Sequence, residues 1–171
     1  MDGRGVDIWS RANGVTHGDG AEGVGRVAFV DLAESRLDLA SSFGFEPVAV
    51  GSAELLKWHH RADLVVEATG VPAVASGITG FMANGGKGLF FGVCPSDAKI
   101  NVSPFEVFRR QLTLAGSHSL NHSIQRSLEI IDGLGRDIER AVSHSLPQKE
   151  ISNILSSKPP EDSLKIQWMV N

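Results

Sequence analysis

The chain has 171 residues, and its 16 Lys and Arg against 20 Asp and Glu give a formal net charge of −4. This charge argues against a nucleic acid or an anionic membrane as a partner recognised by bulk charge. Hydrophobic residues make up 42% of the chain and charged residues 21%, which is typical of a globular chain built around one main domain.

The cysteine count and the hydropathy pattern exclude further classes of protein. Cys94 is the single cysteine, which excludes an intramolecular disulfide and a structural zinc site of four thiolates. No apolar run approaches the roughly 18 residues that span a bilayer, and Met1 is not followed by the apolar segment of a secretion signal. We therefore expect a cytoplasmic protein with no membrane partner and no nucleic-acid partner.

Short apolar runs and amphipathic segments alternate from Arg26 onward. The apolar run 27–30 ends on Asp31, which is typical of a buried parallel strand. Asp31 and Glu34 then have the spacing of a capped helix start, and Gly44 stands where a C-terminal cap belongs. Further runs predict strands at 47–50, 63–67, 88–93 and 112–116, and helices at 52–60, at 72–83 and from the S-x-x-E box at 103–106.

The last third of the chain continues the alternation. Ile124, Leu128 and Ile131 mark one face of an amphipathic helix. A strand at 141–145, a helix through 151–155 and a strand at 164–168 are predicted to complete the chain.

This order predicts an α/β fold with a Rossmann-like, doubly wound, mostly parallel sheet. Residues 1–23 differ from the rest, because they hold six glycines and no sustained apolar period. We expect a poorly ordered glycine-rich leader over 1–23, a nucleotide-binding domain over 24–140, and a strand–helix–strand segment over 141–171.

Ligands of such sheets bind at the carboxyl ends of the strands. Asp31 ends its predicted strand. A carboxylate at the end of the second strand of a dinucleotide fold can accept hydrogen bonds from both hydroxyls of the adenosine ribose and repels a 2′-phosphate, which favours NAD over NADP. Arg36 would reach over the same ribose. The alternative is that Asp31 only caps its helix and Arg36 is a solvated surface cation.

Two glycine-containing turns follow later strands. Thr69-Gly70 and Gly92-Val93 would let the backbone approach a nucleotide closely. Their alternative is an ordinary turn at the end of a strand. The G-x-G-x-x-G match at 18–23 is rejected as a phosphate loop, because it does not lie between a strand and a helix and stands only eight residues before Asp31.

Metal and thiol chemistry have weak candidates. His118 and His122 have the spacing of a helical metal pair, but no third ligand stands nearby in the sequence, so surface or capping histidines are the favoured interpretation. Cys94 is interpreted as a small, half-buried apolar residue. No catalytic residue and no metal ligand is predicted in this chain.

Together, the segment 26–31, Ser35 to Leu37, the segment 63–70, Gly92-Val93 and the segment 114–117 resemble the cofactor-binding, C-terminal half of zinc-type medium-chain alcohol and polyol dehydrogenases, especially the sorbitol and threonine dehydrogenase branch. The resemblance covers about residues 24–171. It implies NAD as the cofactor, with zinc only in a separate N-terminal catalytic domain that this chain lacks. The cofactor-binding residues it implies are Asp31, Arg36, Ala68, Thr69, Gly70, Phe91, Gly92, Val93, Gly116 and Ser117.

The chain departs from that family at its start. Family members begin the nucleotide fold with a strand, a glycine loop and a helix, and residues 1–23 do not supply them. The absent strand is the central one of the order 3-2-1-4-5-6. The sheet would close by re-pairing, by borrowing the leader or by recruiting another chain.

Two functions remain open at this stage. The first is the NAD-binding part of an oxidoreductase that moves hydride between a secondary alcohol and NAD, inactive as this chain alone. The second is a non-catalytic, truncated Rossmann module that acts by pairing with other chains. A homo-oligomer is plausible through the strand at 112–116, if it is an unpaired edge.

Overall fold

In the computed structural model, the residues described are 6–10, 25–118, 123–134, 139–140, 142–157, 163 and 165–169. The chain divides into two compact units, residues 1–118 and 119–171. The first unit therefore ends just after its last strand, whereas the nucleotide-binding domain was expected to run to residue 140.

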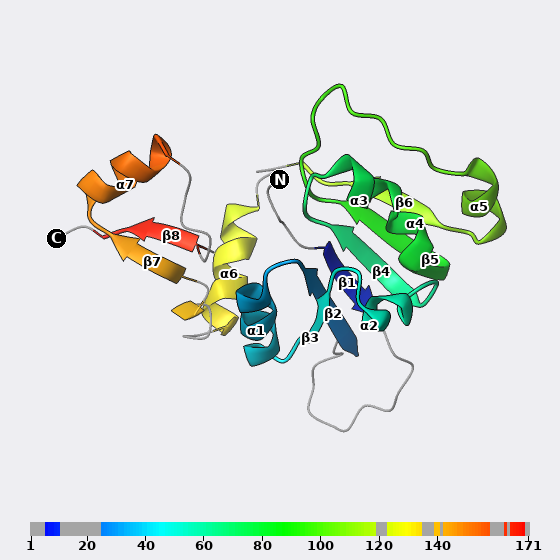
Figure 1. Cartoon of the computed structure of the whole chain (residues 1–171), viewed down its shortest axis with the longest axis horizontal. Coiled ribbons are helices and arrows are strands. Elements are labelled where there is room, and N and C mark those ends of the chain that lie inside the picture. Colours follow the sequence, from blue (N-terminus) through cyan, green and yellow to red (C-terminus); the bar gives the residue numbers. More distant parts are fainter. Residues whose placement is uncertain are drawn as a thin grey trace. The chain divides into compact units, whose positions relative to one another are not determined.

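The first unit is built on one six-stranded sheet (Figure 1). Its strand order is β3-β2-β1-β4-β5-β6, and the pairs β2/β3, β4/β5 and β5/β6 are parallel. The predicted doubly wound, mostly parallel sheet is thus confirmed. The strands are β1 (Val6–Ser10), β2 (Arg26–Asp31), β3 (Glu46–Ala49), β4 (Ala62–Glu67), β5 (Met82–Phe90) and β6 (Thr113–Gly116).

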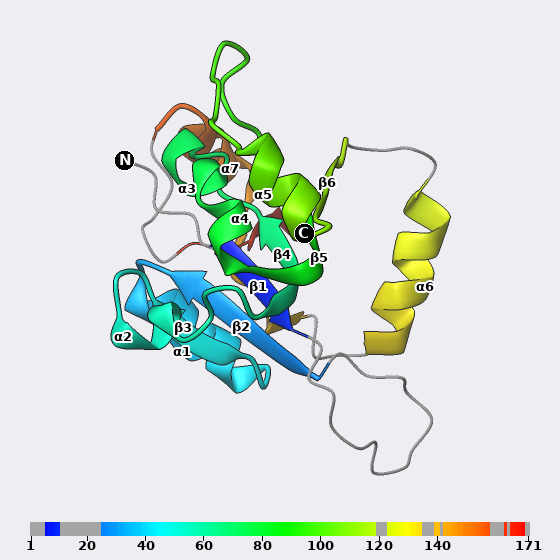
Figure 2. The same cartoon turned by 90° about the vertical axis from the view of Figure 1, so that its right-hand side faces the viewer.

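The central strand β1 comes from the glycine-rich leader and runs the opposite way to its neighbours. It pairs antiparallel with both β2 and β4. Val6 lies level with Val30 and Glu67, and Ser10 lies level with Arg26. The first strand of a dinucleotide fold lies between β2 and β4. Here that position is occupied by β1, which runs in the opposite direction (Figure 2).

The helices of the first unit are α1 (Glu34–Ser42), α2 (Ala53–Leu56), α3 (Pro72–Ser76), α4 (Ile78–Phe81) and α5 (Pro104–Arg109). Helix α1 packs against β2 and β3, and α4 packs against β4 and β5. The capping box before α5 is confirmed, because the Ser103 Oγ accepts a hydrogen bond from the Glu106 N–H at 3.3 Å. Gly44 follows α1 with a φ of 84°, a left-handed conformation that suits glycine at a helix end.

The predicted side-chain cap of α1 is wrong. The N-cap of α1 is Ala33, which has no side chain able to accept a hydrogen bond. Asp31 belongs to β2 and lies two residues before that cap.

Two element boundaries also differ from the prediction. The helix expected at 72–83 is split at Gly77, which ends α3 and begins α4. Strand β5 then starts at Met82 and contains an irregularity, because Ala62 pairs with Met82 but Leu64 pairs with Lys87. Gly85, with a φ of 76°, lies within this irregularity. Since β5 ends at Phe90, residues 91–93 form a turn and not the end of the strand.

The core of the first unit lies between the sheet and its helices. Apolar side chains from four strands meet the single buried tryptophan of the described core. The buried members of this cluster are Ala28, Val30, Val48, Trp58, Ala62, Val65, Ile78, Met82 and Leu112.

The second unit contains α6 (Ile124–Leu134), β7 (Val142–Leu146), α7 (Gln148–Leu155) and β8 (Lys165–Trp168). Strands β7 and β8 pair in parallel as a separate two-stranded sheet. These elements match the predicted helix, strand, helix and strand. Across the described parts of both units, no helix is long and apolar enough to cross a membrane.

Candidate functional site

Asp31 is a buried carboxylate at the carboxyl end of β2. Its side chain is 1% exposed. The Oδ1 atom accepts a hydrogen bond from the Ala33 N–H at 2.9 Å, which turns the chain from the strand into α1. The Oδ2 atom is also buried, and no described residue donates a hydrogen bond to it. A buried acceptor with spare capacity at the ligand-binding edge of the sheet is a candidate contact for a hydroxyl-bearing ligand.

Arg36 is the charged partner of this carboxylate. Its Nη1 atom lies 3.6 Å from the Asp31 Oδ2, and its side chain is 23% exposed. At that distance the pair is a loose ion pair, longer than a direct charge-assisted hydrogen bond. Because Oδ2 is closed to solvent, a ligand reaches it only if a neighbouring side chain, such as that of the partly exposed Arg36, moves.

Glu67, at the carboxyl end of β4, is a residue that the sequence analysis missed. Its side chain is fully buried. The Oε1 atom accepts hydrogen bonds from the Thr69 N–H at 2.7 Å and the Gly70 N–H at 3.0 Å, and also from the Thr69 hydroxyl. The Thr69 Oγ1 in turn accepts from the Val71 N–H at 2.9 Å. The carboxylate therefore fixes the turn at 68–71, while its Oε2 is buried with no hydrogen-bond donor among the described residues.

The turns after β4 and β5 are in direct backbone contact. A Cβ on Gly92 would lie 2.2 Å from the Gly70 N, and a Cβ on Gly70 would lie 2.4 Å from the Val93 O. Gly70 also has a φ of 69°, which favours glycine. Both glycines are therefore required by this close approach, whatever else the turns do.

The remaining predicted site residues lie on the same edge of the sheet. The Gly92 N–H and Phe91 N–H donate to the Glu67 backbone carbonyl at 2.7 and 2.9 Å, and the Ser117 N–H donates to the Phe90 carbonyl at 3.1 Å. The structure thus brings together the ends of β4, β5 and β6. Phe91, Val93, Gly116 and Ser117 are exposed, and Ala68 is half-buried.

The first residue of β1 separates this group from Asp31. Val6 pairs with Val30 on β2 and with Glu67 on β4. In a dinucleotide fold this place at the carboxyl edge belongs to a glycine turn and the helix N-terminus that binds pyrophosphate. Here β1 begins at that place, so the described residues place neither a glycine turn nor a helix N-terminus between the carboxyl ends of β2 and β4.

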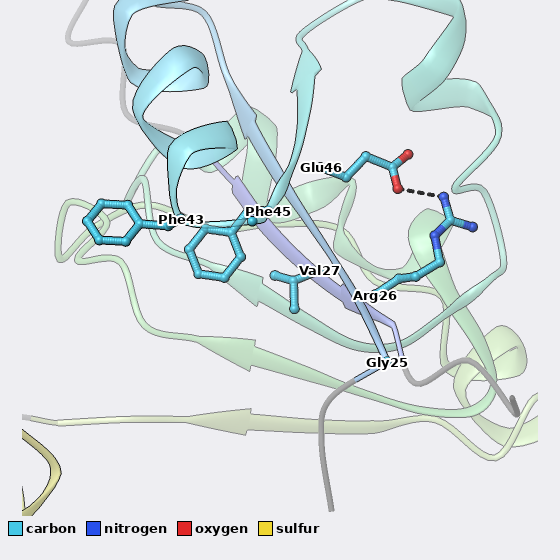
Figure 3. A pocket seen from close by; sticks show the side chains of 7 residues that line it. Gly25, Arg26, Val27, Phe43, Phe45 and Glu46 are labelled. Atoms are coloured by element: carbon cyan, nitrogen blue, oxygen red, sulfur yellow. Dashed lines mark hydrogen bonds and ion pairs between the residues drawn. The ribbon is translucent and has the colours of Figure 1, made fainter. Parts of the chain in front are cut away.

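A pocket of the first unit lies at the other end of β2. Gly25, Arg26 and Val27 form one wall, and the segment 43–46 forms the other (Figure 3). Arg26 and Glu46 make an ion pair of 2.5 Å, and the Arg26 guanidinium lies 5.1 Å from the centre of the Trp58 ring. Because this hollow is at the amino ends of β2 and β3, it is not the expected ligand edge of the sheet.

Among the described residues, no three His, Cys, Asp or Glu side chains lie close enough together to hold a metal ion. His118 is exposed at the end of the first unit. His122 and the glycine motif at 18–23 lie outside the described residues. Cys94 is half-buried and has a free thiol.

Comparison with known proteins identifies one family. The family model described as zinc-binding dehydrogenase matches residues 19–133. The chain is 42% identical over 149 residues to D-altritol 5-dehydrogenase from Agrobacterium fabrum, which is 86% of this chain and 44% of that protein. It is 27% identical over 107 residues to D-arabinitol dehydrogenase 1 from Uromyces fabae, which is 63% of this chain and 31% of that protein. The chain therefore spans less than half the length of these relatives.

Solved structures show the same fold at low sequence identity. A zinc-binding dehydrogenase from Sinorhizobium meliloti, bound to NADP, matches with a TM-score of 0.76 at 20% identity, over 86% of this chain and 46% of that chain. The 2R,3R-butanediol dehydrogenase from Bacillus subtilis matches with a TM-score of 0.65 at 18% identity, over 83% of this chain and 43% of that chain.

Proposed function

Since the chain belongs to the zinc-binding dehydrogenase family, we propose that it is the NAD-binding part of a polyol dehydrogenase. The observation that carries this proposal is the buried, incompletely hydrogen-bonded Asp31 carboxylate at the carboxyl end of β2. The relative at 42% identity is a D-altritol 5-dehydrogenase, which supports a sugar alcohol as the substrate class. NAD would accept hydride from the secondary alcohol when bound.

Asp31 would hold the adenosine end of the cofactor. With Arg36 swung outward, the Oδ2 atom would accept hydrogen bonds from the hydroxyls of the ribose. The same negative charge would repel a 2′-phosphate, so NAD is favoured over NADP. Arg36, which lies in the first turn of α1, would then be placed beside the ribose or adenine.

The turns after β4, β5 and β6 would line the rest of the site. Ala68, Thr69 and Gly70 would flank the adenosine, in the conformation that the Glu67 carboxylate imposes. The exposed segment 91–93, together with Gly116 and Ser117, would lie towards the nicotinamide. Their shared position at the carboxyl edge supports this assignment.

Catalysis by a zinc-type dehydrogenase needs zinc ligands and a substrate pocket in addition to a cofactor site. The family resemblance places these ligands and this pocket in a separate domain. We therefore propose that the chain alone does not oxidise alcohols. We propose that the protein is located in the cytoplasm, where nicotinamide cofactors are present and a free thiol such as that of Cys94 stays reduced.

A second role, pairing with another copy, is favoured by the sheet edge. Among the described strands, β6 is the last of the six-stranded sheet and pairs only with β5. Its Thr113, Ala115 and Gly116 are exposed, and the neighbouring helix α5 exposes Phe105 and Phe108. An open strand edge beside exposed aromatic side chains is suited to pairing with its own copy.

Calorimetric titration with NADH and NADPH tests the cofactor role. The wild-type chain should bind NADH at least about ten-fold more tightly than NADPH. The substitution Asp31→Asn should remove most of this preference, whereas Asp38→Asn, which neutralises an exposed carboxylate on α1, should leave it intact. Absence of NADH binding by the folded wild-type chain would refute the proposal.

A further inference from the structure

The direction of β1 determines which part of a dinucleotide this chain can recognise. Parallel strands place a βα turn and a helix N-terminus at the carboxyl edge, and backbone N–H groups there bind phosphate. β1 runs antiparallel, so its carboxyl end at Ser10 lies level with Arg26, the first residue of β2. The carboxyl end of β1 therefore lies at the amino edge of the sheet, at the opposite end of β2 from Asp31.

The charges at the carboxyl edge also oppose a pyrophosphate. Asp31 and Glu67 are buried carboxylates that end the two strands flanking β1. Glu34 adds a third carboxylate in the first turn of α1. Among the described residues, the cation paired with Asp31 is Arg36, whose Nη1 lies 3.6 Å from the Asp31 Oδ2. A group carrying two negative charges would gain little attraction at this edge and would meet repulsion from these carboxylates.

Adenosine has no phosphate, so it needs no helix N-terminus for binding and is not repelled by these carboxylates. Its ribose hydroxyls are donors and carry no charge, and the Asp31 Oδ2 is a buried acceptor that lacks a donor among the described residues. Supplying that donor would remove the cost of an unsatisfied buried oxygen.

We propose that this chain recognises the adenosine end of its cofactor as an isolated ligand, and that the pyrophosphate adds nothing to the affinity. The proposal rests on the NAD-binding role stated above and narrows it to a purine nucleoside site. ADP should therefore bind no more tightly than adenosine.

Titration of the whole chain with adenosine, ADP and NADH tests this directly. ADP carries the two phosphates without the nicotinamide, so the ratio of the ADP and adenosine dissociation constants isolates the phosphate contribution. The expected ratio lies within about three-fold of one. Raising NaCl from about 0.05 to 0.5 M should leave adenosine binding unchanged and should not weaken ADP binding, because screening removes only repulsion.

Variants distinguish a direct role of the Asp31 carboxylate in ligand binding from a loss of binding through misfolding. Asp31→Asn should weaken adenosine and ADP binding equally, by about ten-fold or more, while the matched Asp38→Asn variant should leave both unchanged. Far-UV circular dichroism of each variant establishes that it is folded, and the wild-type comparison of ADP with adenosine does not depend on any variant.

The outcomes distinguish the two proposals. Binding of ADP at least ten-fold more tightly than adenosine would overturn the nucleoside proposal and leave the NAD-binding role standing. Absence of binding by all three ligands would overturn both. Equal binding of adenosine and ADP, weakened to the same extent in Asp31→Asn, is the result that the structure predicts.

Discussion

The Glu67 carboxylate offers a sharp test of how the turn after β4 is held. Its Oε1 atom accepts from the backbone N–H groups of Thr69 and Gly70 and from the Thr69 hydroxyl. Replacement by Ala removes the acceptor and leaves these donors in a site where Glu67 is fully buried and Thr69 is 5% exposed.

The two substitutions Glu67→Ala and Glu67→Gln should differ strongly. Each buried donor left without a partner costs about 1–3 kcal/mol, and the lost side-chain volume adds a cavity. With three such donors, Glu67→Ala should therefore lower the free energy of unfolding by at least about 3 kcal/mol. Glu67→Gln keeps an acceptor at Oε1 and neutralises a charge whose second oxygen has no described donor, so its effect should stay within about 1 kcal/mol.

Urea unfolding followed by tryptophan fluorescence measures both changes. Trp58 is 5% exposed and belongs to the core of the first unit, so its emission reports unfolding of the sheet that carries Glu67. The reasoning is refuted if Glu67→Ala unfolds at the wild-type urea concentration. It is equally refuted if Glu67→Gln is as unstable as Glu67→Ala, since the charge and not the acceptor would then matter.

Three further predictions concern the turns, a buried cation and the central strand. Gly92→Ala should cost about 2–4 kcal/mol in urea unfolding, because its Cβ would lie 2.2 Å from the Gly70 N, whereas Gly116→Ala, which meets nothing within 4 Å, should stay within about 0.5 kcal/mol. Arg110→Met should cost about 3 kcal/mol in the same assay, because the 5% exposed guanidinium donates to the carbonyls of Thr79 and Met82 and to the Asn84 amide oxygen; an effect below 1 kcal/mol would contradict these contacts. Deletion of residues 1–10 should abolish cooperative unfolding of the first unit, because β2 and β4 both lose their neighbour in the sheet; an intact transition reported by Trp58 would show that β1 is not needed.

Most strands and helices were predictable because their signals are local. The apolar run before Asp31, the capping box at 103–106 and the periodicity of 124–131 each specify an element within a short window. The split of the 72–83 helix and the irregular β5 depend instead on how Gly77 and Gly85 fit between neighbouring elements. Sequence patterns do not report such fits.

The direction of β1 could not be read from the sequence. Its residues, Val6–Ser10, can pair equally well in either direction as far as local propensity is concerned, and the slot between β2 and β4 is filled only in the folded sheet. Glu67 was missed for a related reason. It was treated as the last residue of a strand, and the acid directly after Val65-Val66, followed by Thr69-Gly70, was the available signal.

Asp31 shows the opposite case. Its position after an apolar run correctly indicated the end of a strand, but the sequence could not distinguish a ribose contact from a helix cap. The structure removes the side-chain cap of α1, since Ala33 is the N-cap. The Oδ2 atom, buried and without a described donor, is what makes a ligand contact worth testing.

Amide chemical-shift mapping of the isotope-labelled chain during titration with NADH measures most directly which edge of the sheet binds a ligand. The carboxyl-edge site predicts saturable shifts at Leu32, Ala33, Thr69 and Gly70, with no change at Phe43 to Glu46 around the hollow at the opposite edge. Shifts confined to that hollow, or no shifts at either edge, would contradict the assignment of Asp31 as the residue that receives the ribose.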